Sequence, residues 1–220
     1  MPSSPFSPGV RFFRAIGPPG FRALFHVLAR ITVEGREHVP ERGPYLIVFN
    51  HLAIADPPLV LAFWPYRVEA LGAGNMMDSF LVGHIMRWYG TVRVERDEDD
   101  REMLKRALQQ LRDGRPLLIA PEGTRSHRPG MRPAKPGAAF LAIKSGAPLV
   151  PVGVTGTELL FDRWRPWRRP WLRMQIGPSF QLPFTSVSGA ERHHTLREAT
   201  DMIMRKIAAL LPPEYRGVYA

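Results

Sequence analysis

Apolar positions along the chain form short runs that alternate with amphipathic segments. Runs rich in valine, isoleucine and aromatic residues, bounded by glycine, proline and polar residues, predict strands. They lie at 31–33, 45–49, 67–71, 91–95, 117–120, 149–154 and 172–176. Segments with apolar residues three or four positions apart predict helices. They lie at 56–63, 78–88, 100–112, 137–144 and 188–211. This alternation favours an α/β fold with a mostly parallel central sheet and helices on both faces.

The N-terminal segment has a different pattern, in which apolar residues are interspersed with arginines between positions 10 and 29. The Gly-Pro-Pro-Gly sequence at 17–20 predicts a break, because proline interrupts a helix, so we expect two short basic amphipathic helices. One interpretation is a helical cap over the sheet, another is an anchor on a membrane surface, and both can hold at once. We therefore divide the chain into a tail with amphipathic helices at 1–30 and one α/β domain at 31–220.

Composition narrows the classes of function. The formal net charge is +10 over 220 residues, from 30 lysines and arginines against 20 aspartates and glutamates. This balance favours an anionic partner, which is a nucleic acid, an anionic membrane or a phosphorylated substrate. The absence of cysteine excludes thiol nucleophiles, disulfides and thiolate metal sites. No uncharged apolar run reaches the roughly 20 residues that span a bilayer, so we expect no transmembrane span.

Several motifs of cofactor and nucleophile sites are absent. The sequence has no Gly-x-Ser-x-Gly turn, no phosphate loop ending in Gly-Lys-Ser/Thr and no His-Glu-x-x-His zinc motif. Gly72 and Gly74 lack the third glycine of a dinucleotide-binding loop. We therefore expect neither a metal nor a cofactor.

His51 and Asp56 are the first candidates for chemistry, in the string NHLAIAD at 50–56. Pro57 follows Asp56, and proline is favoured at the first helical position, so we expect Asp56 to be a helix N-cap and His51 to lie on the preceding loop. A turn there lets the carboxylate reach the imidazole, orient it and stabilise the imidazolium formed on proton abstraction. The alternative is a simple helix cap beside a surface histidine.

The string PEGTRS at 121–126 follows another predicted strand. Gly123 allows backbone N–H groups to approach an anion closely, and Arg125 can pair with phosphate oxygens. The alternative is a polar turn with an exposed arginine. We expect a proton acceptor and an anion site together to serve group transfer to the hydroxyl of a phosphorylated acceptor.

Two further cations follow predicted strands or the loops beside them, namely Arg96 and Lys135. Each taken alone is equally a solvated surface residue. If the strands are parallel, four segments that follow them emerge at one edge of the sheet, namely 50–56, Arg96, 121–126 and 155–158. The carboxyl ends of parallel strands are where open α/β sheets bind ligands.

The segment 161–173 combines three tryptophans with five arginines and two prolines. Tryptophan with arginine suits a lipid headgroup interface. The same composition suits single-stranded nucleic acid, or a loop whose tryptophans pack on the domain. We favour the membrane interpretation, because the N-terminal segment indicates the same partner.

Four blocks in this order resemble the glycerolipid acyltransferase family, whose best-known member acylates 1-acylglycerol-3-phosphate. The matches are a His-x4-Asp motif at 51–56, a second block at 90–96 with Arg96 at the arginine position, PEGTRS at 121–126 and an apolar-proline block at 149–152. The similarity runs from about residue 33 to the last predicted helix.

The resemblance implies a glycerol-3-phosphate acyltransferase-like fold, with 31–220 as the acyltransferase domain. His51 would take the proton of the acceptor hydroxyl while Asp56 orients it, and the alkoxide would attack the thioester of acyl-CoA or an acyl carrier protein. The residues implied to hold the acceptor are Arg96, Glu122, Gly123, Thr124, Arg125 and Lys135.

Our leading hypothesis is therefore a peripheral or monotopic O-acyltransferase of phospholipid biosynthesis, acting on lysophosphatidate at the cytoplasmic face of the cell membrane, with no nucleic-acid partner. Two departures from the family pattern matter. The segment 74–77 lacks a frequent lysine, which weakens lysophosphatidate as the acceptor, and Ala120 replaces a common phenylalanine, which widens the pocket locally. The alternatives are an acyltransferase for another lysolipid or polar lipid, and a catalytically silent lipid-surface binder.

Overall fold

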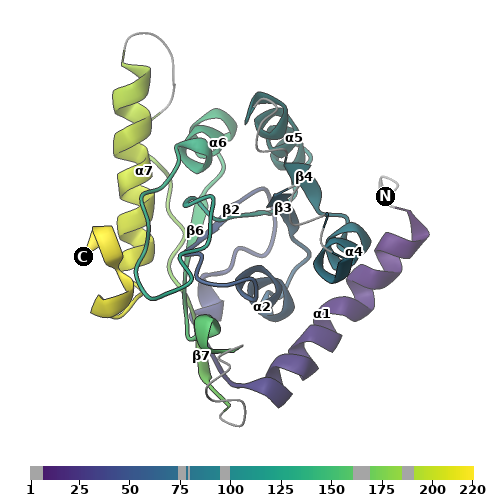
Figure 1. Cartoon of the computed structure of the whole chain (residues 1–220). Coiled ribbons are helices and arrows are strands. Elements are labelled where there is room, and N and C mark those ends of the chain that lie inside the picture. The colour runs from purple at the N-terminus through teal and green to yellow at the C-terminus, as the bar shows by residue number, and fades with distance from the viewer. Residues whose placement is uncertain (1–6, 74–77, 79, 95–99, 161–168, 185–190) are drawn as a thin grey trace.

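The computed structural model describes residues 7–73, 78, 80–94, 100–160, 169–184 and 191–220. The strands of these residues form one seven-stranded sheet (Figure 1). Their order across the sheet is β1 (Arg30–Glu34), β7 (Trp171–Ile176), β6 (Leu149–Thr155), β2 (Leu46–Phe49), β5 (Leu117–Ile119), β3 (Glu69–Ala73) and β4 (Val92–Val94). Of the pairs between these strands, β6–β7 is antiparallel and the others are parallel, which confirms the predicted mostly parallel sheet.

Helices cover both faces of this sheet, as predicted (Figure 1). The α-helices of the described residues are α1 (Pro8–Leu28), α2 (Asp56–Phe63), α4 (Phe80–Tyr89), α5 (Asp100–Arg112), α6 (Gly137–Ser145) and α7 (Arg192–Ala208). One hydrophobic cluster lies under α5, α6 and α7, and a second lies under α1 and α2. The two clusters make a three-layered α/β arrangement.

The central strand β2 contributes to both clusters. Leu46 and Val48 belong to the cluster under α5, α6 and α7, whereas Ile47 and Phe49 belong to the cluster under α1 and α2. Successive side chains of a strand point to opposite faces, so a strand with helices on both sides must be apolar throughout. The loop after β2 therefore starts from a fixed, fully buried point.

Helix α1 is continuous, so the predicted break at 17–20 is wrong. Arginines on either side of the proline pair hold the helix to the domain. The buried Arg14 guanidinium pairs with Glu69 through Nη1–Oε1 at 2.9 Å and Nη2–Oε2 at 2.5 Å, and Arg22 Nη2 donates to the Ala62 carbonyl at 2.8 Å. Proline inside a helix costs about 3 kcal/mol, so the pair at 18–19 costs about 6 kcal/mol, more than one ion pair offsets. The contacts on both sides of the pair, together with the packing of α1 on α2 and α4, keep α1 helical through the prolines.

The outward face of α1 is apolar. Phe12, Ile16 and Val27 are 65%, 51% and 70% exposed, and at 100° per residue they lie opposite the buried Arg14 and Phe25. The inward face packs against α2 and α4, so α1 caps the domain as one interpretation expected. In the part of the chain that the structure describes, no helix is both long enough and apolar enough to cross a membrane.

The other element boundaries differ from the predictions by at most two residues, except for the last helix. Helix α7 begins later than the predicted capping box, with Glu191 as an N-cap that makes no side-chain hydrogen bond, and 185–190 lie outside the described residues. It ends at Ala208 because the next turn tightens, with Leu210 N donating to Ile207 O at 3.0 Å before Pro212.

The tryptophan-rich prediction falls mostly on 161–168, outside the described residues. Its last tryptophan, Trp171 on β7, is 69% exposed, and the Arg30 guanidinium lies 5.9 Å from its ring centroid.

Candidate active site

The loops after β2 and β5 lie side by side at the carboxyl edge of the sheet. Ser126 N donates to the His51 carbonyl at 2.8 Å, and His127 N donates to the Leu52 carbonyl at 3.0 Å. These two bonds join the loops that follow the paired strands β2 and β5. The structure thus brings the 50–56 and 121–126 strings together, as parallel strands require.

His51 and Asp56 form a hydrogen-bonded pair, with His51 Nδ1 2.8 Å from Asp56 Oδ2. An ionised carboxylate only accepts hydrogen bonds, so Nδ1 carries the proton and Nε2 is left as the basic nitrogen. The His51 side chain is 17% exposed, whereas that of Asp56 is fully buried. A substrate can therefore reach the pair only through the histidine, which suits a general base that acts through Nε2.

The Asp56 carboxylate organises the loop before α2. Its Oδ2 also accepts Leu52 N at 2.6 Å and Ala53 N at 2.7 Å, and its Oδ1 accepts the Thr157 hydroxyl. Ala55 is the N-cap of α2, so the prediction of Asp56 as the cap is wrong by one position. The Asp56 carboxylate points back to the N–H groups of the preceding loop and does not cap the first turn of α2, because those donors surround it. The simple helix cap beside a surface histidine is thereby excluded.

Two buried polar side chains hold the His51 loop from behind. Asn50 Oδ1 accepts Val154 N at 2.7 Å, and Asn50 Nδ2 donates to Val154 O at 2.8 Å. Glu122, which is 3% exposed, accepts His51 N at 2.8 Å through Oε1 and Arg132 N at 2.7 Å through Oε2. Burial raises the pKa of the Glu122 carboxyl, and the two N–H donors offset part of that rise. With both oxygens bonded to backbone, Glu122 supports the loops instead of contacting an acceptor phosphate.

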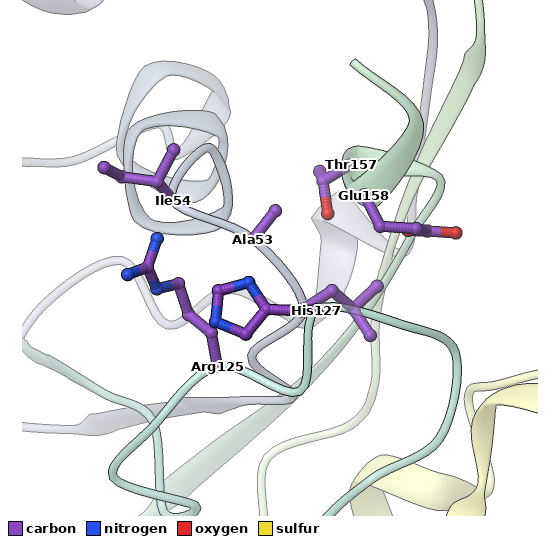
Figure 2. A pocket seen from close by; sticks show the side chains of 7 residues that line it. Ala53, Ile54, Arg125, His127, Thr157 and Glu158 are labelled. Atoms are coloured by element: carbon purple, nitrogen blue, oxygen red, sulfur yellow. The ribbon is translucent and has the colours of Figure 1, made fainter. Parts of the chain in front are cut away.

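A cavity of about 190 Å³ (Figure 2) lies beside the residues that follow His51, and its lining includes neither His51 nor Asp56. It is lined by Leu52, Ala53, Ile54, Arg125, His127, Thr157 and Glu158. The His127 ring lies beside the Arg125 side chain, while Thr157 and Glu158 approach from the opposite side (Figure 2). Guanidinium and imidazole N–H groups are suited to phosphate oxygens. His127 has φ 61°, a left-handed conformation that is uncommon for a residue with a side chain and that clusters at functional sites.

Gly123, Thr124 and Lys135 lie at or beside the PEGTRS turn, outside the cavity lining. Gly123 has φ 66°, and its N–H donates to the Ala120 carbonyl at 3.1 Å, so this N–H closes the turn. A Cβ on Gly123 would lie 3.2 Å from the Lys135 side chain, which crosses the turn with its end exposed. Thr124 is half-buried beside Arg125. Arg96 lies outside the described residues.

Sequence reasoning missed the roles of three residues in this site. Asn50 and Thr157 pair with groups about a hundred positions away, so no local pattern assigns them a partner. The available signal was their position, since Asn50 directly follows β2 and Thr157 follows β6 after one glycine, both at the edge where such sheets bind ligands. His127 directly follows the PEGTRS string, and its available signal was an imidazole two positions after Arg125. Among the residues that the structure describes, no cluster of three or more His, Cys, Asp or Glu residues could hold a metal ion.

Comparison with known protein families shows to which family this chain belongs. A family model described as Acyltransferase matches residues 30–155, which is more than half of the 220 residues. The chain belongs to the acyltransferase family. The matched part includes the His51–Asp56 pair and the PEGTRS turn, so the resemblance stated from the four sequence blocks is confirmed for this acyltransferase-family chain.

Curated relatives of this family member carry the name 1-acyl-sn-glycerol-3-phosphate acyltransferase. The protein from Chlamydomonas reinhardtii is 29% identical over 199 residues, which are 86% of this chain and 55% of the relative. The protein from Borreliella burgdorferi is 27% identical over 134 residues, 60% of this chain and 54% of the relative. The human alpha form is 29% identical over 127 residues, 56% of this chain and 44% of the relative. The chain thus spans about half the length of these relatives.

A solved structure has the same fold. The crystal structure of the 1-acyl-sn-glycerophosphate (LPA) acyltransferase PlsC from Thermotoga maritima matches with a TM-score of 0.66 at 22% sequence identity. The match covers 91% of this acyltransferase-family chain and 78% of the other. This likeness supports the α/β architecture that positions the site.

Proposed function

We propose that this chain transfers a fatty acyl group from the thioester of acyl-CoA or an acyl carrier protein to the free hydroxyl of lysophosphatidate, giving phosphatidate. The observation that carries the proposal is the His51–Asp56 pair and, beside the residues that follow His51, a cavity that Arg125 lines. A base beside a cation suits an acceptor that has both a hydroxyl and a phosphate. The names of the relatives support the same reaction.

The proposed transfer is direct. His51 Nε2 takes the proton of the acceptor hydroxyl as the oxygen attacks the thioester carbonyl, and the C–S bond of the resulting tetrahedral intermediate breaks. The leaving thiolate takes the proton back from the imidazolium, so the products are an ester and a free thiol, and His51 is again neutral. Asp56, 2.8 Å from Nδ1, stabilises the imidazolium while it exists.

The cavity is the proposed place for the acceptor headgroup. Arg125 can bind phosphate oxygens through two N–H groups at once, and the His127 ring beside it supplies another donor (Figure 2). Thr124, Lys135 and Arg96 remain proposed contributors to the same anion site. Thr124 belongs to the turn, Lys135 to the loop that follows it, and Arg96 follows β4 in the sequence.

The exposed face of α1 supports a peripheral location at an anionic membrane surface, proposed to be the cytoplasmic face of the cell membrane. Phe12, Ile16 and Val27 form an apolar stripe on this helix, and the exposed Arg11 lies along its side. An amphipathic helix of this composition binds in the plane of a headgroup region, with arginine attracted to anionic lipids. A membrane-bound enzyme would meet its lipid acceptor and product at that surface.

The reaction can be followed by the thiol that it releases. The chain has no cysteine, so a thiol-reactive dye reports only free CoA or carrier-protein thiol. We expect acceptor-dependent thiol release by the wild type and a rate about 10²–10⁴-fold lower for His51→Ala, since a positioned base contributes that much. His193→Ala, an exposed histidine on α7, is the matched control and should keep the wild-type rate.

The acceptor panel separates the candidate functions. A lysolipid other than lysophosphatidate is the second candidate, because 74–77 lacks the lysine frequent in the family. Faster thiol release with another lysolipid would favour that acceptor. Equal turnover by wild type and His51→Ala would refute the proposed base. Retained vesicle binding with no turnover on any acceptor would favour a silent lipid-surface binder.

A further inference from the structure

A segment after α7 lies against the loop that follows the PEGTRS turn. It comprises the short helices η3 (Pro213–Tyr215) and η4 (Gly217–Tyr219), and we call residues 213–219 the clamp. Met131 N donates to the Tyr215 carbonyl at 3.1 Å, and Val218 N donates to the Met131 carbonyl at 3.3 Å. The backbone of the clamp is therefore hydrogen-bonded to both the N–H group and the carbonyl group of one loop residue, Met131.

The grip depends on a glycine. Gly217 has φ 56°, and a Cβ at this position would lie 2.2 Å from Met131 O and 2.4 Å from Met131 N. No side chain fits so close to a backbone, whereas glycine adopts both the conformation and the approach without strain. A second contact lies beside it, where Ala134 N donates to the Tyr219 hydroxyl oxygen at 3.1 Å.

One chain of contacts leads from the loop held by the clamp to the candidate base. Arg132, the residue after Met131, donates its N–H to Glu122 Oε2 at 2.7 Å. The other carboxylate oxygen of Glu122 accepts the N–H of His51 at 2.8 Å. The position of Met131 thus bears on the backbone of His51 through one buried carboxylate.

A second chain of contacts leads from the clamp to Asp56. The Tyr215 hydroxyl donates to Glu158 Oε1 at 2.5 Å, and the neighbouring Thr157 donates its hydroxyl to Asp56. Among the described residues, Glu158 Oε2 is buried and has no hydrogen-bond partner, and Tyr215 is the side-chain donor that they offer to this carboxylate. Burial and the Glu158 carboxylate raise the pKa of Tyr215, which therefore remains a donor throughout the neutral range.

We propose that the clamp is a positioning element for acyl transfer, which holds both supports of the His51–Asp56 pair and one wall of the Arg125 cavity. The inference rests on the proposed function. The clamp lies outside residues 30–155 that the family model matches, so the family match does not assign it. Its residues touch no reacting atom and act through Glu122, Thr157 and Glu158. A misplacement of about 1 Å in an active site can cost about 10²-fold in rate, so a modest shift of these supports is sufficient.

Two variants open the clamp in different ways. Tyr215→Phe removes one hydroxyl and keeps the ring packed, which releases Glu158. Gly217→Ala drives the clamp from Met131 without changing any side-chain chemistry. Gly146→Ala is the matched control, because Gly146 has a similar φ of 67° but nothing lies within 4 Å of its Cβ position. It carries the same conformational cost without the clash.

We expect kcat to fall at least about tenfold in Tyr215→Phe and Gly217→Ala, with the KM for acyl-CoA within about twofold of the Gly146→Ala value. A loss of global stability alone would leave the kcat of the folded fraction unchanged. Wild-type kcat in both clamp variants, with His51→Ala inactive, would overturn the clamp and leave the proposed function standing.

Amide hydrogen exchange measures the effect of the clamp on the loops independently of enzyme activity. In Gly217→Ala we expect the Met131, Arg132 and His51 amides to exchange at least about tenfold faster than in Gly146→Ala. The Met131 amide is bonded to the clamp, and the other two are bonded to Glu122 in the first chain of contacts. If the wild type acylates no acceptor, the proposed function fails and this measurement still decides the positioning role. Unchanged protection of these amides would overturn it.

Discussion

The replacement Asp56→Asn separates the charge of the dyad from its shape. The wild-type carboxylate accepts from His51 Nδ1, Leu52 N and Ala53 N on one oxygen and from the Thr157 hydroxyl on the other. An asparagine amide can turn its oxygen to the three N–H donors and donate its NH2 group to the Thr157 oxygen. The variant therefore keeps the loop geometry while the fully buried negative charge disappears.

The expected loss of rate can be estimated from the distance between His51 Nδ1 and Asp56 Oδ2. At an effective dielectric constant of about 20, unit charges 2.8 Å apart attract by about 6 kcal/mol, which bounds what Asp56 gives to the imidazolium. The amide dipole and its remaining hydrogen bond recover part of this. We expect kcat to fall about 10²–10³-fold, or about 3–4 kcal/mol in the barrier, with the acceptor KM within about threefold.

The assay is thiol release from acyl-CoA with lysophosphatidate in mixed micelles, at 25 °C and after circular dichroism has verified the fold. Neutral hydrogen bonds replace charged ones, so a loss of about 1–3 kcal/mol in unfolding free energy is expected and does not prevent folding. Asp113→Asn is the control, since Asp113 lies on the exposed turn after α5. A kcat within threefold of wild type in a folded Asp56→Asn protein would refute the reasoning.

Three further predictions concern the cavity, its support and the outer face of α1. Arg125→Lys should raise the KM for lysophosphatidate about tenfold and change that for a lysolipid without a free phosphate little, because lysine cannot bind phosphate bidentately; equal effects on both acceptors would contradict the role. Glu122→Gln should be destabilised by about 1–3 kcal/mol, since one backbone N–H loses its acceptor. Burial raises the pKa of Glu122 in the folded state, so folding favours the protonated carboxyl. Its contribution to stability is complete below the ordinary glutamate pKa and is lost as pH rises through the folded-state pKa. The difference in unfolding free energy between wild type and Glu122→Gln should therefore shrink from pH 4.5 to 7 in urea titrations, and a growing difference would count against the buried carboxyl. Ile16→Ser with Val27→Ser should lower partitioning to anionic vesicles about 10²-fold at unchanged Tm, because both side chains are exposed in the free protein; unchanged cosedimentation would remove α1 as the anchor.

Much of the site was accessible from the sequence because its parts follow buried strands. The runs at 46–49, 117–119 and 149–155 are almost wholly apolar, which predicts central parallel strands, and parallel strands bring their following loops to one edge. The pairing of His51 with Asp56 was likewise predictable, since a loop and a proline-started helix limit where that carboxylate can go. The direction of the Asp56 carboxylate was not, because another of its donors, Thr157, lies about a hundred positions away on the short helix after β6.

The sequence by itself determined the alternation of strands and helices, the family and the pair of residues proposed as base and orienter. These depend on local propensity, on periodicity and on residues within one loop. The tertiary structure alone decided that α1 continues through Pro18 and Pro19, that Glu122 is a support for the loops, and that 213–219 grips Met131. Each of these is set by contacts between segments tens of residues apart or more, whose free energy exceeds local preferences and leaves no trace in the pattern of neighbouring residues.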